Sequence, residues 1–244
     1  MNYKRFPVGA LWTNSYVFWD DDTHQAFCVD PGGDTQDIRD FLTAQSLKLT
    51  MILLTHGHID HIAGIHELVP FVGDNIYIGA KDAFSLRHPA GQLQALLGVH
   101  CEGISDFKEV SDGRVIDFPG YTIKVMETPG HTEGSVCYLV TDSQNHSLLL
   151  SGDTLFAQSV GRTDLDGGDD LKLDASLRRL DTLPDSLHVL PGHGPDTYIA
   201  SEREMNPYWP RWEYYENVQI NIRISRYGRR NRSRFVKHSR LRQG

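Results

Sequence analysis

The chain has 244 residues, of which 39% are hydrophobic and 23% are charged, and its formal net charge is −8. This composition is typical of a globular protein with one larger domain. The three widely spaced cysteines form no Cys-x-x-Cys pair, so they suggest neither a disulfide framework nor a zinc ribbon. The acidic excess argues against nucleic acid or an anionic membrane as the partner of the whole surface.

The charge is unevenly distributed along the chain. Residues 1–216 contain 15 basic and 32 acidic residues, whereas the 28 residues after Glu216 contain nine basic residues and no acidic one. We therefore expect a folded domain over 1–216 and a basic, disordered tail over 217–244. Because such a tail binds nucleic acid only non-specifically, no specific nucleic-acid partner is expected.

The N-terminal region contains an apolar run over residues 6–19, which Asn14 and Ser15 interrupt. No small-residue cleavage site follows this run, which argues against a signal peptide. No stretch approaches the roughly 20 apolar residues of a membrane helix. The cysteine usage fits a reducing compartment. We expect a cytoplasmic protein without a membrane partner.

The first 80 residues are expected to alternate strands and helices. Apolar-rich runs between turn residues predict strands, and apolar residues at helical spacing predict helices. The continuous apolar run over 51–55 is typical of a strand buried on both faces. The predicted strands cover residues 15–19, 25–29, 51–55 and 76–80, and the predicted helices cover 35–47 and 61–69.

The rest of the chain is expected to form a second sheet. Residues 81–112 have a weaker pattern, which we interpret as mixed helix and loop. Antiparallel strands are predicted over 115–118, 121–127, 135–141 and 147–151, followed by a helix over 171–183 and a strand over 188–190. A four-layer αβ/βα sandwich of the α+β class, with two mixed sheets flanked by helices, accommodates this order. Propensity alone does not distinguish it from other α+β arrangements.

Three histidines and one aspartate lie within six residues directly after the buried strand over 51–55. His56 and His58 can converge on one metal ion, and Asp60 and His61 can face a second ion beside it. The alternative is a helix cap with solvated histidines. The density of metal-competent side chains favours the metal site.

Three further candidate ligands each follow a predicted strand and lie beside a glycine. His131, Asp153 and His193 share this context, in which glycine allows a tight backbone turn. A single aspartate at a strand end is more often a helix cap than a ligand. Taken together, the five histidines and two aspartates are predicted to be the ligands of two neighbouring ions.

The motifs THGHIDH, PGHT, SGDTLF and PGHGP, in this order, resemble the metallo-β-lactamase superfamily. Within it, VDPGG over 29–33, GDTLFAQSVGRTDLDGGD over 152–169 and PGHGPDT with the segment 202–207 are similar to the glyoxalase II (hydroxyacylglutathione hydrolase) branch, in its short bacterial form. The resemblance covers residues from about 7 to about 210 and implies the four-layer sandwich fold.

The resemblance implies a ligand assignment and a reaction. The first metal would be held by His56, His58 and His131, the second by Asp60, His61 and His193, with Asp153 bridging them. Both ions would be divalent, zinc first, with iron or manganese as alternatives. A water between them would attack an acyl thioester, and Asp60 would orient it as a catalytic residue. The implied substrate is S-2-hydroxyacylglutathione, such as S-D-lactoylglutathione.

The segment after GDTLF is where this chain departs from the family. The family contacts glutathione there through a lysine and a tyrosine, whereas this chain has Arg162 and Asp164. Arg162 is a candidate for binding a substrate carboxylate, and a salt bridge to a nearby aspartate is the alternative.

Rival functions on the same scaffold are a persulfide dioxygenase with a single iron and a lactone or phosphodiester hydrolase. Asp153 and the missing signal peptide disfavour a periplasmic β-lactamase, since true β-lactamases of the superfamily do not keep an aspartate bridge there. The long inserted domain of nuclease relatives cannot fit in this length.

Overall fold

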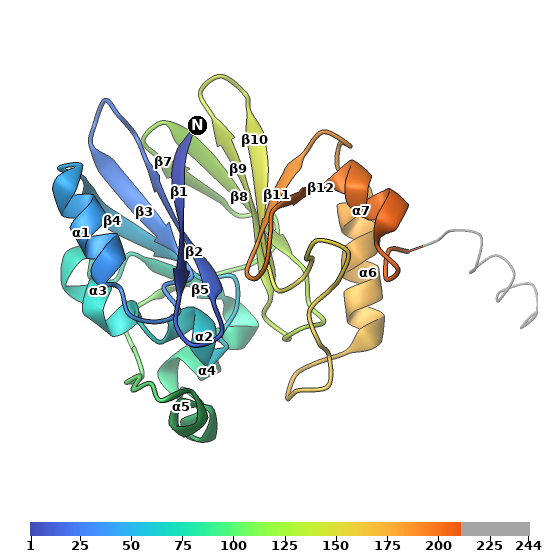
Figure 1. The fold of residues 1–244 in the computed structure, drawn as a ribbon, viewed down its shortest axis with the longest axis horizontal. Coiled ribbons are helices and arrows are strands. Elements are labelled where there is room, and N and C mark those ends of the chain that lie inside the picture. The colour runs from blue at the N-terminus through green and yellow to red at the C-terminus, as the bar shows by residue number, and fades with distance from the viewer. Residues whose placement is uncertain (211–244) are drawn as a thin grey trace, which may run out of the picture. The chain divides into compact units, whose positions relative to one another are not determined.

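The computed structural model describes residues 1–210, except for the side chains of residues 92, 93 and 96. Two six-stranded sheets lie face to face, with helices on their outer sides (Figure 1). The expected four-layer sandwich is therefore confirmed. The domain boundary expected at 216 and the tail over 217–244 lie outside the described residues.

The first sheet has the strands in chain order: β1 (Asn2–Val8), β2 (Thr13–Trp19), β3 (Gln25–Val29), β4 (Lys48–Leu53), β5 (Ile76–Gly79) and β6 (Lys108–Val110). Strands β1, β2 and β3 pair antiparallel, as the short turns between them require. Strands β3 to β6 pair parallel, because helical segments connect them.

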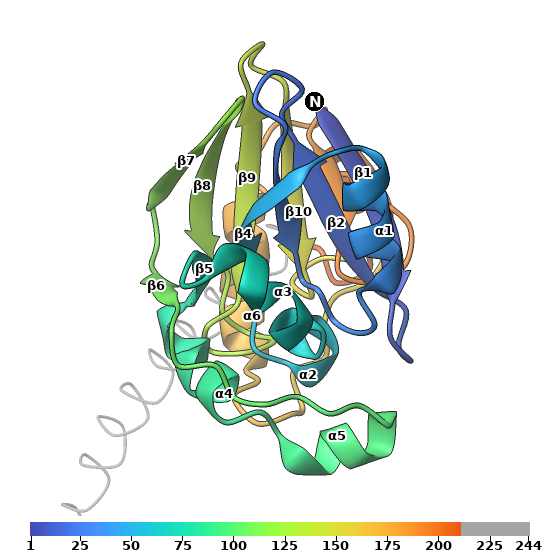
Figure 2. The same ribbon diagram turned by 90° about the vertical axis from the view of Figure 1, so that its left-hand side faces the viewer.

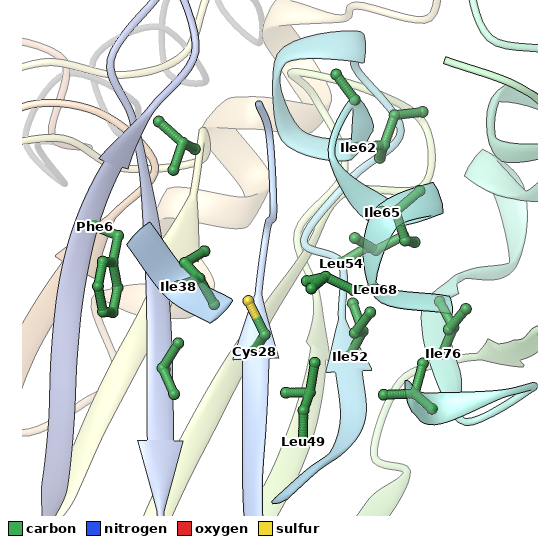
Figure 3. Packing of buried hydrophobic residues seen from close by; sticks show 14 of the residues in the cluster. Phe6, Cys28, Ile38, Leu49, Ile52, Leu54, Ile62, Ile65, Leu68 and Ile76 are labelled. Atoms are coloured by element: carbon green, nitrogen blue, oxygen red, sulfur yellow. The ribbon is translucent and has the colours of Figure 1, made fainter. Parts of the chain in front are cut away.

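Those connections contain α1 (Gln36–Ala44), α2 (Ile59–Ile62), α3 (Ile65–Val72), the 3₁₀ helix η1 (Ala80–Asp82), α4 (Ala83–Arg87) and α5 (Gly91–Leu97). Figure 2 shows α1 and α3 on the outer face of the first sheet. Apolar side chains fill the space beneath them, among them Ile38, Ile65 and Leu68 against Cys28 and Ile52 (Figure 3).

The second sheet begins with the predicted antiparallel meander, formed by β7 (Val115–Phe118), β8 (Tyr121–Glu127), β9 (Val136–Asp142) and β10 (Ser147–Gly152). After α6 (Asp170–Leu180), strand β11 (His188–Pro191) pairs parallel to β10, and β12 (Thr197–Tyr198) and α7 (Ile199–Met205) follow. Helix α6 packs on the outer face of this sheet through Leu173, Leu177 and Leu180.

Strand β4 shows why the central layers of the sandwich need a continuous apolar run. Ile52 faces the helices, whereas Met51 and Leu53 face the second sheet, where they join Phe27 and Tyr138 in the core between the two sheets. Because both faces of the strand are buried, no polar alternation remains.

Several elements differ from the sequence-based expectation, among them β12 and α7, for which no range was predicted. Strand β1 was not predicted, and β6 forms in a region expected to be helix and loop. The single helix expected over 61–69 is instead α2 followed by α3, with Gly64 between them. A Cβ at Gly64 would lie 2.7 Å from the Thr35 side chain, so this turn presses against the start of α1. Within residues 1–210, no helix is long and apolar enough to span a bilayer.

Candidate metal centre

The loops that follow β4, β8, β10 and β11, together with the short helix α2, bring the seven predicted ligands close to one another. The first set is His56, His58 and His131, whose ligand atoms all lie within 4.8 Å of one another. His56 Nε2 and His58 Nδ1 are 3.1 Å apart. This is the grouping that the resemblance implied for the first metal.

The second set is Asp60, His61 and His193, again within 4.8 Å. The Nε2 atoms of His61 and His193 are 3.3 Å apart. The Oδ2 atom of Asp60 lies 3.3 Å from His193 Nε2 and 3.6 Å from His61 Nε2. Two imidazoles and a carboxylate therefore converge at one point.

Asp153 lies between the two sets. Its Oδ1 is 3.3 Å from His61 Nε2, and its Oδ2 is 3.5 Å from His131 Nε2 and 3.6 Å from His193 Nε2. One carboxylate thus faces ligands of both sets. A Cβ on Gly192 would overlap Asp153 Oδ1 and would lie 2.7 Å from His61 Cε1, so only glycine leaves room beside this carboxylate.

The chemistry of these donors fits divalent metal ions. His131 Nε2 and Asp153 Oδ1 are buried without a hydrogen-bond partner, which is costly unless another group satisfies them. Burial, with the neighbouring imidazoles, lowers the pKa of His56 well below its usual value and that of His58 to about 4. Both rings are therefore neutral near pH 7, as metal ligands must be.

Negative charge is concentrated at the second set. Burial alone would raise the pKa of the Asp60 carboxyl, but His61 and His193 hold it well below its ordinary value. Burial would lower the pKa of His61, but the carboxylates of Asp153, Asp60 and Asp30 raise it well above its ordinary value. The pKa of Asp153 is likewise held below its ordinary value by neighbouring imidazoles, against the effect of burial, so two carboxylates with lowered pKa favour a cation here.

Groups behind the ligands orient the rings. His131 Nδ1 lies 2.7 Å from the backbone oxygen of Arg162, and His193 Nδ1 lies 3.2 Å from that of Leu11. His56 Nδ1 lies 3.1 Å from Thr55 Oγ1. In each case one ring nitrogen is bonded outward, so the other is aimed at the centre.

Asp30 lies behind ligands of both sets, although in the sequence it stands out only as part of the VDPGG motif. It is buried at the end of β3, where its φ is 47°. Its Oδ2 accepts from Thr55 Oγ1 at 2.7 Å and lies 3.0 Å from His61 Nδ1. Through Thr55 it also supports His56, so one carboxylate orients a ligand from each set. The signal available was an aspartate after a buried strand, followed by Pro-Gly-Gly.

Arg162, the predicted substrate contact, is exposed, and its guanidinium forms two hydrogen bonds with the Asp164 carboxylate, of 2.7 and 2.8 Å. This is the salt bridge weighed as the alternative. Binding of a substrate carboxylate by Arg162 stays a prediction. Phe156 adds an aromatic ring 6.0 Å from that of His193.

Comparison with known proteins identifies the family. The family model described as the metallo-beta-lactamase superfamily matches residues 8–193. The chain belongs to this superfamily. The probable metallo-hydrolase YqgX of Bacillus subtilis is 35% identical over 85% of this chain and 97% of its own length. The hydroxyacylglutathione hydrolase GloC of Haemophilus influenzae is 30% identical over 85% of this chain and 98% of its own length.

Solved structures of the superfamily share the fold. The BLEG-1 B3 metallo-beta-lactamase has a TM-score of 0.77 and 34% identity, covering 86% of this chain and all of that one. TTHA1623 in a di-iron-bound form has a TM-score of 0.73 and 30% identity, covering 84% and 99%. Membership of this superfamily indicates a metal-dependent hydrolase, and the His/Asp cluster indicates a site for two metal ions.

Proposed function

We propose that this member of the superfamily hydrolyses acyl thioesters, and that its substrate is S-2-hydroxyacylglutathione, with S-D-lactoylglutathione as the first compound to test. The products would be a 2-hydroxy acid and glutathione. The observation that carries the proposal is Asp153, whose carboxylate faces ligands of both sets and makes them one shared centre. The 30% identity to GloC over nearly its whole length supports the choice of substrate.

The residues of the centre would hold two divalent ions, which supply a water of lowered pKa and a Lewis acid for the acyl carbonyl oxygen. Imidazole and carboxylate ligands suit zinc, and equally iron or manganese. We propose zinc first. The di-iron form of TTHA1623 makes iron the principal alternative.

The protein's own groups would position the reactants. Asp60 is ionised at neutral pH, and Thr13 Oγ1 lies 3.4 Å from its Oδ2. The carboxylate can accept a hydrogen bond from the attacking water and fix its orientation. A thiolate leaving group needs little protonation, so the site requires no separate general acid. We propose Arg162 as the contact for a substrate carboxylate, which requires its pair with Asp164 to open.

The test is hydrolysis of S-D-lactoylglutathione by purified protein loaded with zinc or with iron. We expect turnover by the wild type and a loss of at least about 100-fold in kcat for Asp60→Ala. Asp22→Ala, which changes an exposed aspartate in the turn between β2 and β3, should keep the wild-type rate. No thioester cleavage by the loaded wild type, or equal rates for wild type and Asp60→Ala, would refute the proposal.

A second candidate is hydrolysis of a β-lactam ring. The 34% identity to BLEG-1 over its whole length favours it, whereas Asp153 was an argument against it. Penicillin and cephalosporin substrates therefore belong in the same assay. Oxygen consumption with glutathione persulfide tests the dioxygenase alternative. Turnover of either class with a higher kcat/KM than the thioester would replace the proposed substrate.

We also propose a cytoplasmic location and a small-molecule thioester substrate, with neither a membrane nor a specific nucleic acid as partner, on the sequence features described above. Cell fractionation with an antibody against the chain tests the location. Recovery with the membrane pellet or in the culture medium would contradict it.

A further inference from the structure

A buried carboxylate outside the ligand set lies between two of the metal-binding loops. Asp82 ends the 3₁₀ helix η1, and only 5% of its surface is exposed. Its Oδ2 accepts from the backbone nitrogen of Gly57 at 2.8 Å and from Thr132 Oγ1 at 2.7 Å. Its Oδ1 accepts from the backbone nitrogen of Gly134 at 2.8 Å. Both oxygens are therefore engaged by donors from elsewhere in the chain.

The donors belong to the loops that carry the first ligand set. Gly57 lies between His56 and His58, and Thr132 directly follows His131. One carboxylate thus connects the loop after β4 to the loop after β8, which are more than 70 residues apart in the sequence. The three ligands of the first set come from these two loops and from no other.

Glycines at the points of contact allow the two loops to come this close to Asp82. A Cβ on Gly57 would lie 2.7 Å from Ser85 Cβ, just beyond the 3₁₀ helix. A Cβ on Gly134 would lie 2.6 Å from Asp82 Oδ1. Both loops have glycine where they meet η1 and α4, so their N–H groups can reach the carboxylate.

Within residues 1–210, the Asp82 carboxyl group makes no ion pair with lysine, arginine or histidine, and its partners are the N–H and O–H donors described above. A buried carboxylate that only N–H and O–H donors satisfy is costly to fold, because its charge is not neutralised. A metal ion bound by the first ligand set would supply positive charge at the loops that this carboxylate contacts.

We propose that Asp82 is a positioning residue, which holds the two loops at the spacing that the first metal requires and thereby sets the affinity of that site. Asp60, His61 and His193 form no hydrogen bond or ion pair with it, so the second site should not depend on it in the same way. The inference rests on the metal centre of the proposed function, but not on the thioester substrate.

The test is Asp82→Asn, in which an amide NH₂ replaces one acceptor oxygen and faces an N–H or O–H donor. We expect one of the two metal equivalents to bind about 10- to 100-fold more weakly, which is the usual effect of removing a group behind a ligand. The other equivalent should keep its wild-type affinity. Metal content after dialysis against graded chelator, and the visible spectrum of the cobalt-loaded protein, report the two sites separately from activity.

Asp106→Asn is the matched control, because it makes the same change at an exposed aspartate. It should bind two equivalents like the wild type. Should Asp82→Asn not fold, Thr132→Val removes a single donor to the carboxylate at nearly constant shape, and a smaller loss at the same site is expected.

Wild-type affinity at both sites of Asp82→Asn, or an equal loss at both, would overturn the inference, as would unchanged binding in Thr132→Val when Asp82→Asn does not fold. Wild-type protein that binds no divalent ion would overturn the inference together with the proposed function. Two bound ions without thioester hydrolysis would overturn the proposed substrate alone.

Discussion

Asp30→Asn tests how the carboxylate behind both ligand sets supports the centre. Three donors depend on it: the backbone nitrogen of Thr55 at 2.8 Å from Oδ1, and Thr55 Oγ1 and His61 Nδ1 at 2.7 and 3.0 Å from Oδ2. Asparagine has one acceptor oxygen and adds a donor. At least one of the three donors is then left without its acceptor in a buried site.

The loss divides into stability and metal affinity. One buried donor without a partner costs about 1–3 kcal/mol, so we expect metal-free Asp30→Asn to unfold with a free energy lower by that amount. His61 presents a free Nε2 to the second set only while Nδ1 carries the proton and donates to Asp30. An amide NH₂ facing Nδ1 favours the opposite tautomer, so the second metal should bind about 10- to 100-fold more weakly.

Urea denaturation of the metal-free protein and metal content after dialysis measure the two effects separately. Asp22→Asn makes the same change at an exposed turn position and should behave like the wild type in both. If Asp30→Asn unfolds at the wild-type urea concentration and retains both ions, the role assigned to this carboxylate is wrong.

Three other predictions concern the scaffold. Phe27→Ala should lower the free energy of unfolding by about 3–5 kcal/mol in urea denaturation, because Phe27 is fully buried between the sheets. The exposed Phe84→Ala should change it by less than about 0.5 kcal/mol, and similar losses for the two would contradict the assigned core. Gly152→Ala should lower the melting temperature more than Gly73→Ala. Both glycines have positive φ, but a Cβ at Gly152 would also lie 2.5 Å from Thr55 Cβ, whereas Gly73 faces open space. Burial raises the pKa of the thiol to about 12 for Cys28 and to about 11 for Cys101 and Cys137. The native protein should therefore react with a thiol reagent only after addition of urea. A rapid reaction of the native protein would refute the burial of these thiols.

Much of the fold could be predicted because its signal is local. The meander from β7 to β10 shows apolar alternation or apolar runs between turn residues, and each of its strands was expected near its observed position. Strand β1 could not be predicted because only Phe6 and Val8 of its seven residues are buried, so its strand conformation comes from pairing with β2. The break between α2 and α3 could not be predicted either, since it depends on the contact of Gly64 with a distant segment.

By itself, the sequence predicted a metal site, because metal binding depends on residue types and His131, Asp153 and His193 each stand beside a glycine after a predicted strand. Which ligands share an ion was implied only by resemblance. The tertiary structure brings the candidates together, for example His61 and His193, which are 132 residues apart in the sequence. The hydrogen-bond partners of Asp30 and Asp82 became visible only in the structure. These partners lie 25 to 52 residues away, and a carboxylate's function follows from the donors that surround it.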